Sequence, residues 1–248
     1  MKIATWNVNG IRAREAQVGA LLDEHPDVLC LQELKAAREQ VPESLAGRED
    51  YWSYWHGTGG YSGVSIHFRK AAFPSEPSYS HPVFDMETRI AQAVAGDTAF
   101  TSVYIPNGGK DYAAKLAFMR EMEGYVAGVH AAGLKLVLCG DMNVALTDMD
   151  IHPSQNKPGI IGTSPEERAL LAAIIGPDLV DVGRRLDPVN NRLFTWWPPW
   201  KVARQRNLGW RIDYIFASQS LAAHATECRV LKDVGTSDHA PVIATFAI

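Results

Sequence analysis

The sequence predicts one α/β domain in which β-sheets pack face to face and helices cover their outer faces. Strand patterns separated by short turns outnumber helical patterns along the 248 residues, and only two long helices are indicated. No repeat, low-complexity segment or linker-like change in composition divides the chain. We therefore expect residues 1–248 to form a single domain. A purely parallel, doubly wound sheet fits the mixture of hairpins and longer connections less well.

Each expected strand is a short apolar or alternating run bounded by turn residues. In chain order, these runs cover residues 2–8, 27–33, 51–56, 64–68, 89–95, 98–105, 136–140 and 210–216, followed by a last hairpin that ends at 246. Gly96-Asp97 is a hairpin signal, which predicts an antiparallel pair on either side of it. Residues 74–82 are expected to form loop with a short edge strand.

Helices are expected where apolar residues recur at helical spacing, and the segments cover residues 11–24, 36–45 and 112–130, with one more beginning at Ser164. Ser164 as N-cap and Pro165 at the first helical position give the last helix a defined start. The glycine-rich turn 57–63 lacks the spacing of a phosphate-binding P-loop. Strand, helix and strand near the N-terminus indicate packed α/β layers.

Composition restricts the class of protein. Three widely spaced cysteines without a C-x-x-C pair argue against a disulfide framework or a zinc site, and suit a reducing compartment. Cys30 and Cys139 lie in apolar strands, so we expect buried thiols. No apolar run approaches the ~20 residues that span a bilayer. Strand pattern begins at Lys2 and leaves no room for a signal peptide. We expect a cytoplasmic monomer with no membrane partner.

The charge distribution points to nucleic acid although the net charge is −4. Residues 184–211 contain one acid, Asp187, and five aromatic residues. The same stretch holds seven basic residues: Arg184, Arg185, Arg192, Lys201, Arg204, Arg206 and Arg211. A solvated loop over a hydrophobic patch is the alternative. The alternation of arginines with tryptophans favours a phosphate-bearing polymer.

Polar side chains recur where the apolar runs end. They are Asn7, Asn9, Glu33, Tyr104, Asn107, Asp141, Asn143, Asp213, Asp238 and His239. If the strands share one core, these residues can meet on one edge. Asp141 and Asn143 follow the most apolar run and point to the same side of an extended chain. An Asp-x-Asn turn that only binds its own backbone is the alternative.

These residue types favour metal-assisted chemistry on a phosphate. No Ser-His-Asp spacing of the hydrolase type and no cysteine near a histidine is present. Oxygen ligands without a thiolate suit Mg²⁺ or Mn²⁺, which polarise phosphoryl oxygens. Asp141 could orient or deprotonate the attacking water. Asn143 and His239 could donate to the pentacoordinate oxygens, with Asp213 holding the His239 ring.

Seven motifs in order carry a resemblance to a known family. They are Asn7-Val-Asn-Gly10, Leu31-Gln-Glu-Leu-Lys35, Gly60-Tyr-Ser-Gly-Val64, Tyr104-Ile-Pro-Asn107, Gly140-Asp-Met-Asn-Val144, Gly209-Trp-Arg-Ile-Asp213 and Ser237-Asp-His-Ala-Pro241. The chain resembles the exonuclease III family of apurinic/apyrimidinic endonucleases, within the endonuclease/exonuclease/phosphatase superfamily. The resemblance runs essentially from residue 1 to 248.

The resemblance implies a four-layer α/β sandwich of two mixed sheets flanked by helices. It implies a DNA-repair enzyme: Mg²⁺-dependent hydrolysis of the phosphodiester 5′ to an abasic site in double-stranded DNA, leaving a 3′-hydroxyl. Removal of 3′-blocking groups and 3′→5′ exonuclease activity accompany it.

The resemblance also implies roles for individual residues. Glu33 would be the principal metal ligand, with Asp238 and Asn9 near the ion and Asn7 supporting Glu33. The groups around the water and the phosphate would be Asp141, Asn143, Tyr104, His239 and, behind the histidine, Asp213. The DNA contacts would come from Asn107, Lys115, Trp196, Trp210, Arg204 and Arg206. Trp196 and Trp210 would clasp a flipped abasic deoxyribose. Ordinary core packing is the alternative for the tryptophans, Trp197 above all, and a solvated loop is the alternative for the arginines.

Three departures from the family pattern bear on detail. Leu34 stands where many members have Thr, and Asn9 stands where some have Asp. Both departures are expected to alter the affinity for the metal. Pro198-Pro199 stiffens the tryptophan-rich loop, which is expected to change the balance of endonuclease and exonuclease activity.

Two rival functions remain at this point. The first is another phosphodiesterase or phosphatase of the superfamily, which would not be expected to carry the Gly209–Asp213 motif after a basic aromatic loop. The second is a non-catalytic nucleic-acid-binding regulator on the same fold. Such a regulator should have lost the Glu, the Asp-x-Asn or the Asp-His of the motifs, and this chain keeps all of them: Glu33, Asp141, Asn143, Asp238 and His239.

Overall fold

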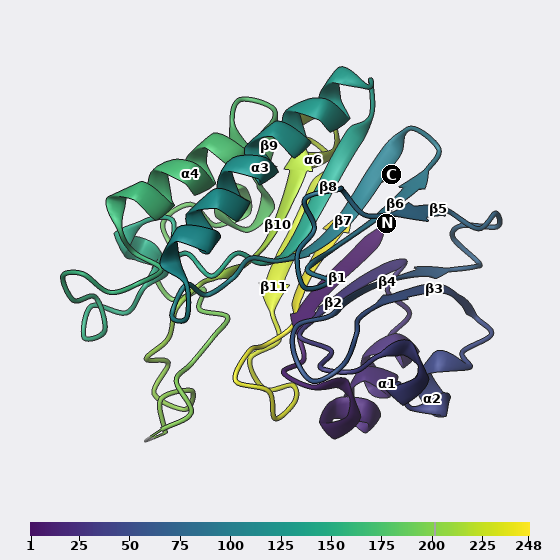
Figure 1. The fold of residues 1–248 in the computed structure, drawn as a ribbon, viewed down its shortest axis with the longest axis horizontal. Coiled ribbons are helices and arrows are strands. Elements are labelled where there is room, and N and C mark those ends of the chain that lie inside the picture. Colours follow the sequence, from purple (N-terminus) through teal and green to yellow (C-terminus); the bar gives the residue numbers. More distant parts are fainter. Residues whose placement is uncertain (201) are drawn as a thin grey trace.

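Two six-stranded mixed sheets pack face to face between helices (Figure 1). The computed structural model describes residues 1–200 and 202–248, so Lys201 of the basic stretch lies outside the described residues. The first sheet has the order β11 (Ala225–Val230), β12 (Val242–Phe246), β1 (Lys2–Asn7), β2 (Val28–Gln32), β4 (Val64–Arg69) and β3 (Tyr51–His56). The second has the order β5 (Ser78–Ser80), β6 (Ile90–Ala95), β7 (Thr98–Tyr104), β8 (Lys135–Asp141), β10 (Asp213–Ser218) and β9 (Leu179–Asp181).

Three apolar layers hold this arrangement together. Side chains such as Ile66, Phe100 and Ile215 fill the space between the two sheets. Helices α1 (Glu15–Asp23) and α2 (Glu43–Ala46) cover the outer face of the first sheet, while α3 (Tyr112–Ala131) and α4 (Pro165–Ile175) cover that of the second (Figure 1). The predicted four-layer sandwich of sheets and helices is confirmed.

The N-cap predicted for α4 is present. The Ser164 hydroxyl accepts a hydrogen bond from the backbone of Glu167, and Pro165 occupies the first turn. The Gly96-Asp97 turn joins β6 to β7 as an antiparallel pair, as expected. Cys30 and Cys139 are buried free thiols. No helix in the described part of the chain is both long and apolar enough to cross a membrane.

The short elements differ most from the sequence-based expectation. The expected helix 11–24 begins as a 3₁₀ turn, Ile11–Arg14, and the segment 36–45 divides into a 3₁₀ turn, Arg38–Gln40, and α2. The elements β9, α5 (Val182–Leu186) and α6 (Gln219–Ala222) were not anticipated. A third 3₁₀ turn spans Asp148–Asp150. Elements of three to five residues are too short to show a period in the sequence.

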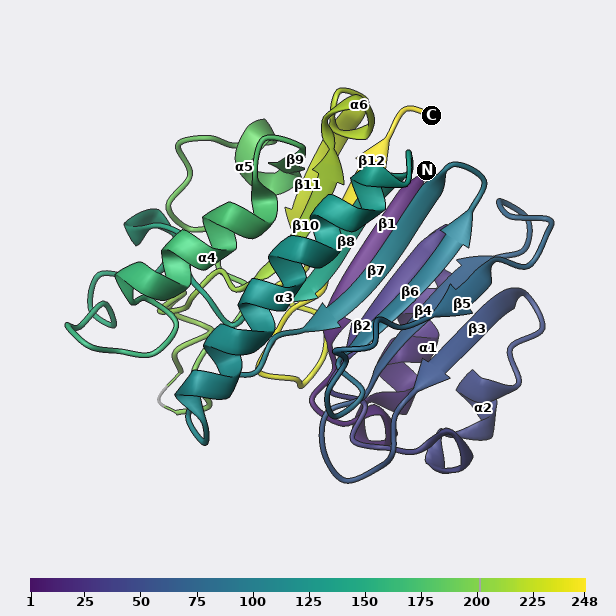
Figure 2. The ribbon, with the colours of Figure 1, turned by 45° about the horizontal axis from the view of Figure 1, so that its top comes forward.

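Strand pairing brings the predicted polar residues to one edge, here called the rim. β1 and β2 are parallel, so Asn7 and Gln32 end side by side, and parallel β7 and β8 pair Tyr104 with Asp141. β10 runs antiparallel to β8, which sets Asp213 opposite Asp141. β12 begins at the same end because it is antiparallel to β1. Figure 2 shows these strands running together toward the loops of the rim.

Candidate active site

Asn7 joins the two sheets at the rim. Its amide nitrogen donates to Glu33 Oε1 and to Asp141 Oδ2, each at 2.9 Å. The Asn7 side-chain oxygen accepts the backbone N–H of Asn9 at 3.0 Å. Asn7 is completely buried, so every hydrogen-bonding group of its side chain is used inside the protein. Residues from the first and second sheets therefore form one continuous polar cluster.

Asp141 and Asn143 form both a local turn and part of the polar cluster, the two interpretations of their motif. Asp141 Oδ1 accepts the backbone N–H of Asn143 at 2.9 Å, which is the local turn, while Asp141 Oδ2 faces Asn7. The Asn143 amide donates to the carbonyl of Ile105 at 2.9 Å. Gly140 is required before this pair, since its φ is +142° and a Cβ there would lie 1.9 Å from the carbonyl oxygen of Val103.

His239 is held between two carboxylates. Its Nδ1 lies 2.9 Å from Asp213 Oδ2, and its Nε2 lies 3.8 Å from Asp141 Oδ2. The Thr195 hydroxyl donates to the same Asp213 oxygen at 2.6 Å and fixes that carboxylate. Burial alone would lower the pKa of His239, but the charges of Asp213 and Asp141 outweigh it and raise the pKa to about 10. The ring is thus a buried cation with Nε2 toward the cluster.

Glu33 and Asp238 anchor a second chain of contacts. Lys35 pairs with Glu33 Oε2 at 2.9 Å and donates to Asn9 Oδ1 at 2.5 Å. Asn9 in turn donates to Asp238 Oδ1 at 2.8 Å, and the indole of Trp196 donates to Asp238 Oδ2 at 3.0 Å. The Asp238 carboxylate is therefore tied to both Asn9 and the aromatic loop.

Three rim residues have left-handed backbones. Each lies one or two positions past the end of a strand. Asn9, Glu33 and Asn143 have φ of +46°, +52° and +50°. Such conformations are unfavourable for most residues other than glycine, although Asn adopts them more readily, and strained residues of this kind cluster at functional sites. Here each turns a side chain from the strand end into the cluster.

The acids of the cluster respond differently to the same burial. Burial is the largest effect on Asp141 and raises its pKa to about 7; the charge of His239 opposes this rise, and the charges of Asp213 and Glu33 add to it. Burial also acts on Glu33, but the hydrogen bond from Asn7 and the charges of His239 and Lys35 lower its pKa. Burial chiefly raises the pKa of Tyr104, which keeps its hydroxyl protonated as a donor.

The donor set fits a hard divalent cation. Ligand atoms of Glu33, Asp141 and His239 all lie within 4.8 Å of one another. Carboxylates of Glu33, Asp141, Asp213 and Asp238 share this site with the cations of His239 and Lys35, which leaves an excess of negative charge. Oxygen-rich sites of this kind suit Mg²⁺. Asp238, expected near the ion, lies outside the three-residue group and is held by Asn9 and Trp196.

A cavity of about 390 Å³ opens beside the cluster. Its lining combines polar residues, among them Glu33, Asp141 and His239, with apolar residues, and these two sets are called its polar and apolar halves below. The apolar residues are Ile160, Ile161, Trp196, Trp210 and Ile212. The rings of Trp196 and Trp210 meet edge to face, with centroids 5.9 Å apart. Trp210 is fixed by a hydrogen bond from its indole to Gln155 at 2.7 Å.

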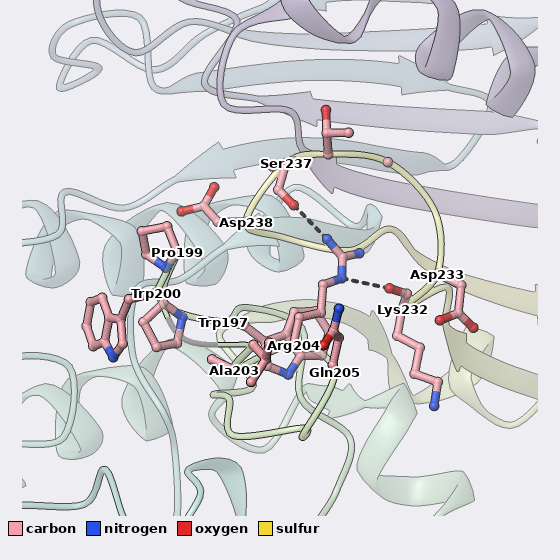
Figure 3. Close-up of a pocket in the computed structure, with 14 residues that line it drawn as sticks. Trp197, Pro199, Trp200, Ala203, Arg204, Gln205, Lys232, Asp233, Ser237 and Asp238 are labelled. Carbon is pink, nitrogen blue, oxygen red and sulfur yellow. Dashed lines mark hydrogen bonds between the residues drawn. The ribbon is translucent and has the colours of Figure 1, made fainter.

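The predicted DNA-contact residues fall into two groups. Asn107 and Arg206 are exposed beside the rim, as a contact with DNA requires. Arg204 instead donates to the carbonyls of Lys232, Val234 and Ser237, and its guanidinium lies 4.9 Å over the Trp197 ring. Figure 3 shows two of these bonds, to Lys232 and Ser237. Arg204 therefore holds two loops together, and Trp197 is buried core, as its alternative interpretation had it.

Lys115 does not fit the expected contact with the DNA backbone. Its side chain is 0% exposed, and its ammonium pairs with Glu167 at 2.6 Å and donates to the carbonyl of Asn143 at 2.8 Å. A buried carboxylate partner explains why this lysine faces inward. It supports the turn of Asn143 from behind.

Several residues of the site were not singled out from the sequence. Lys35, Thr195 and Gln155 contact Glu33, Asp213 and Trp210. Arg89 places its guanidinium 4.6 Å over the Tyr104 ring. Lys35 follows Glu33 by two positions in one motif, which was a usable signal. The other three come from distant segments and have none.

Comparison with known proteins agrees with this geometry. Residues 4–239 match the Endonuclease/Exonuclease/phosphatase family. The chain is 32% identical to the exodeoxyribonuclease of Bacillus subtilis, with 98% of each chain covered. It is 31% identical to the DNA repair nuclease APEX1 of Danio rerio, covering 100% of this chain and 83% of the relative. It is also 33% identical to Recombination repair protein 1 of Drosophila melanogaster, of which it spans 37%.

Solved structures share the whole fold. The 3′ phosphatase NExo from Neisseria, bound to a product DNA hairpin, matches with a TM-score of 0.91 and 30% identity over 100% of both chains. An AP endonuclease from Archaeoglobus fulgidus matches with a TM-score of 0.90 and 30% identity, again over 100% of both.

These matches confirm the resemblance drawn from the seven motifs and the classification of the protein as a nuclease-type phosphodiesterase enzyme. The chain belongs to the Endonuclease/Exonuclease/phosphatase family.

Proposed function

We propose that this protein is a DNA-repair nuclease that hydrolyses the phosphodiester 5′ to an abasic site in double-stranded DNA, with residues 1–248 acting as one catalytic unit. The observation that carries the proposal is the cavity of about 390 Å³, in which an apolar half adjoins the acid–histidine cluster. Among its relatives, the DNA repair nuclease APEX1 and the Archaeoglobus AP endonuclease support this choice.

The polar half suits hydrolysis of a phosphodiester. Asp141, held by Asn7 and the backbone of Asn143, would orient the attacking water and accept its proton. His239 is held as a cation by Asp213 and would stabilise the charge that grows on the phosphoryl oxygens. The Tyr104 hydroxyl is a further donor beside the same cavity, and the Asn143 amide would donate to the phosphate on exchanging its 3.3 Å bond to Asp141 Oδ2. The leaving oxygen becomes the 3′-hydroxyl of the nicked strand.

Glu33 would be the principal ligand of the metal, with Asn9 and Asp238 near it. Mg²⁺ suits this oxygen-rich set better than softer metals, and Mn²⁺ is the substitute expected to support activity. When bound, the ion supplies polarisation of a phosphoryl oxygen and neutralises charge.

The apolar half suits a sugar without a base. Trp196 and Trp210 meet edge to face and are each fixed by a hydrogen bond, so the cavity has a preformed wall. An abasic deoxyribose flips out at low cost because no base has to be unstacked or unpaired. A full nucleotide would also have to place its base.

Processing of 3′ ends is a second activity of the same site. The Neisseria neighbours are a 3′ phosphatase and a 3′–5′ exonuclease by name, with TM-scores of 0.91 and 0.90. A 3′ terminus presents its last phosphodiester to the same cluster without any flipping. We propose that removal of 3′-blocking groups and 3′→5′ exonuclease activity accompany the cleavage at abasic sites, and that the enzyme acts as a cytoplasmic monomer.

The test uses two end-labelled duplexes, one with a single abasic-site analogue and one undamaged. Both are incubated with the protein in Mg²⁺, in Mn²⁺ and with chelator. A metal-dependent nick confined to the lesion supports the proposal. Shortening of both duplexes from their 3′ ends without that nick would keep the catalytic cluster and reject the lesion pocket. Binding without any cleavage would favour the non-catalytic regulator.

A further inference from the structure

A second cluster of histidine and carboxylate lies outside the catalytic site. His56 ends β3, His81 follows β5, and Asp85 lies in the loop between β5 and β6. β3 and β5 are edge strands of the first and second sheet, so the cluster joins the two sheets at one side of the sandwich. Ligand atoms of the three residues all lie within 4.8 Å of one another.

The distances are close to those of a metal site. His56 Nε2 lies 2.6 Å and His81 Nδ1 lies 3.9 Å from the same oxygen, Asp85 Oδ2. Ligand atoms of a tetrahedral Zn²⁺ site are about 3.3 Å apart, given metal–ligand bonds of about 2.0–2.1 Å. Each of these two contacts would change by less than about 1 Å: a rotation of the exposed His81 side chain would shorten the longer one, and a small shift of His56 would lengthen the shorter one.

The carboxylate is already oriented, and the two rings lie beside it and need a turn of His81 to aim both nitrogens at one ion. Asp85 is 3% exposed, and its other oxygen, Oδ1, accepts the backbone N–H groups of Arg89 at 2.8 Å and Ile90 at 3.0 Å. The rings of His56 and His81 stack with centroids 4.5 Å apart, and Tyr54 stacks on the other side of His56 at 5.8 Å. Outer contacts of this kind fix metal ligands in place.

The His56–Asp85 hydrogen bond explains only part of this arrangement. It needs one histidine, whereas a second imidazole ends the stack of Tyr79, Tyr54 and His56 with its Nδ1 3.9 Å from the same carboxylate oxygen. Two imidazoles and one carboxylate are ligands that Zn²⁺ prefers, with a fourth position open to water. The spacing of the cysteines argues only against a zinc site made of thiolates. It does not bear on a site made of two histidines and an aspartate.

We propose that His56, His81 and Asp85 form a Zn²⁺ site, distinct from the Mg²⁺ site of the catalytic cluster, that fastens the β5–β6 loop to the edge of β3. The donor types separate the two sites. The catalytic cluster is rich in oxygen and its histidine is engaged by Asp213, whereas this set offers two ring nitrogens.

The β5–β6 loop also leads to the active site. Asp85 holds the backbone of Arg89, and the Arg89 guanidinium lies over the Tyr104 ring at the rim. A bound Zn²⁺ would therefore fix one end of a segment whose other end supports Tyr104.

The experiment measures Zn²⁺ binding to the chelator-treated protein by calorimetry, in a constant excess of Mg²⁺ so that the catalytic cluster is occupied. His81→Ala tests the site, because this side chain is 48% exposed and its loss should not disturb folding. His224→Ala is the matched control, an exposed histidine outside the cluster. Visible absorption of bound Co²⁺ reports whether the coordination is tetrahedral.

We expect one equivalent of Zn²⁺ for the wild type and for His224→Ala, a tetrahedral Co²⁺ spectrum, and at least tenfold weaker binding for His81→Ala. Equal binding by His81→Ala, or no Zn²⁺ bound in the presence of Mg²⁺, would overturn the proposal. A wild-type protein that nicks abasic DNA without binding Zn²⁺ would reject this site and leave the proposed function intact.

Discussion

The rim cluster and the tryptophan-rich loop, residues 194–211, both line the same cavity and are built differently. In the cluster, residues of one type point to one place: Glu33, Asp141 and Asp213 all present carboxylates to the same site. In the loop, residues of one type do opposite jobs. Trp197 is buried, while Trp200 is 60% exposed.

The arginines of the loop divide in the same way. Arg204 donates to three backbone carbonyls, while Arg206 stays exposed. The difference teaches that strand ends impose a common direction on side chains, whereas an irregular loop assigns each side chain separately. Substitutions in the cluster should therefore all affect catalysis, and substitutions in the loop should separate into catalysis, DNA binding and stability.

The largest effect is expected for Asp141→Asn. Loss of the proton acceptor should lower the rate of nicking at an abasic site by about 10³-fold or more. Because burial raises the pKa of Asp141 from 3.8 to about 7, stability is lost as the pH rises through this range and the loss is complete above pH 7; the neutral amide should relieve this cost. Single-turnover cleavage and urea unfolding at pH 8 measure both. A large loss of stability together with activity would assign Asp141 a structural role instead.

The next effect is expected for Asp213→Asn, which acts through His239. Without that carboxylate, burial should dominate and lower the pKa of His239 from about 10. The ring would then lose its proton at lower pH, so activity should fall by about 10²-fold at pH 8 and recover in part at lower pH. The pH profile of kcat/KM is the measurement. If activity fell but the alkaline side of the kcat/KM profile stayed at the same pH, the role of His239 as a protonated donor would be contradicted.

A smaller effect is expected for Trp196→Ala, and it should be selective. Removing the wall of the cavity and the indole bond to Asp238 should lower nicking at the abasic site by about 10–100-fold. Exonuclease activity on an undamaged end should fall less. Trp200→Ala, from the exposed part of the loop, is the control and should change neither rate by more than about twofold. Equal losses on both substrates would mean that Trp196 acts through Asp238 and not as a wall.

The smallest effects should separate the two arginines. Arg206→Ala should weaken binding of abasic DNA by a few fold. The slope of the logarithm of the binding constant against the logarithm of salt concentration should fall by about one, the value for one phosphate contact. Both are measured in the Asp141→Asn background, in which cleavage is slow. Arg204→Ala should leave that salt dependence unchanged and lower the free energy of unfolding by about 1–3 kcal/mol, because three carbonyls lose their donor. If Arg204→Ala alone changed the salt dependence, the assignment would be reversed.

The same contrast explains what the sequence could predict. Asn7, Glu33, Asp141 and Asp213 could be grouped because each stands at a strand end, and the pairing of β1 with β2 and β8 with β10 brings those ends together. The contact of Lys115 with DNA was expected from the family resemblance alone, whereas its partner Glu167 lies 52 residues away in sequence and leaves no local signal. Gln155 and Thr195 were missed for the same reason.

The termini meet at the end of the first sheet opposite the rim. The Met1 ammonium donates to the carbonyl of Phe246 at 2.6 Å, because β1 and β12 are antiparallel neighbours. Asn7 lies at the other end of β1, about 20 Å away for six extended residues. A partner domain fused to either end would therefore emerge away from bound DNA. For the same reason, a short linker from Ile248 to Met1 should allow a circular permutant that is opened in a surface loop and retains its catalytic rim.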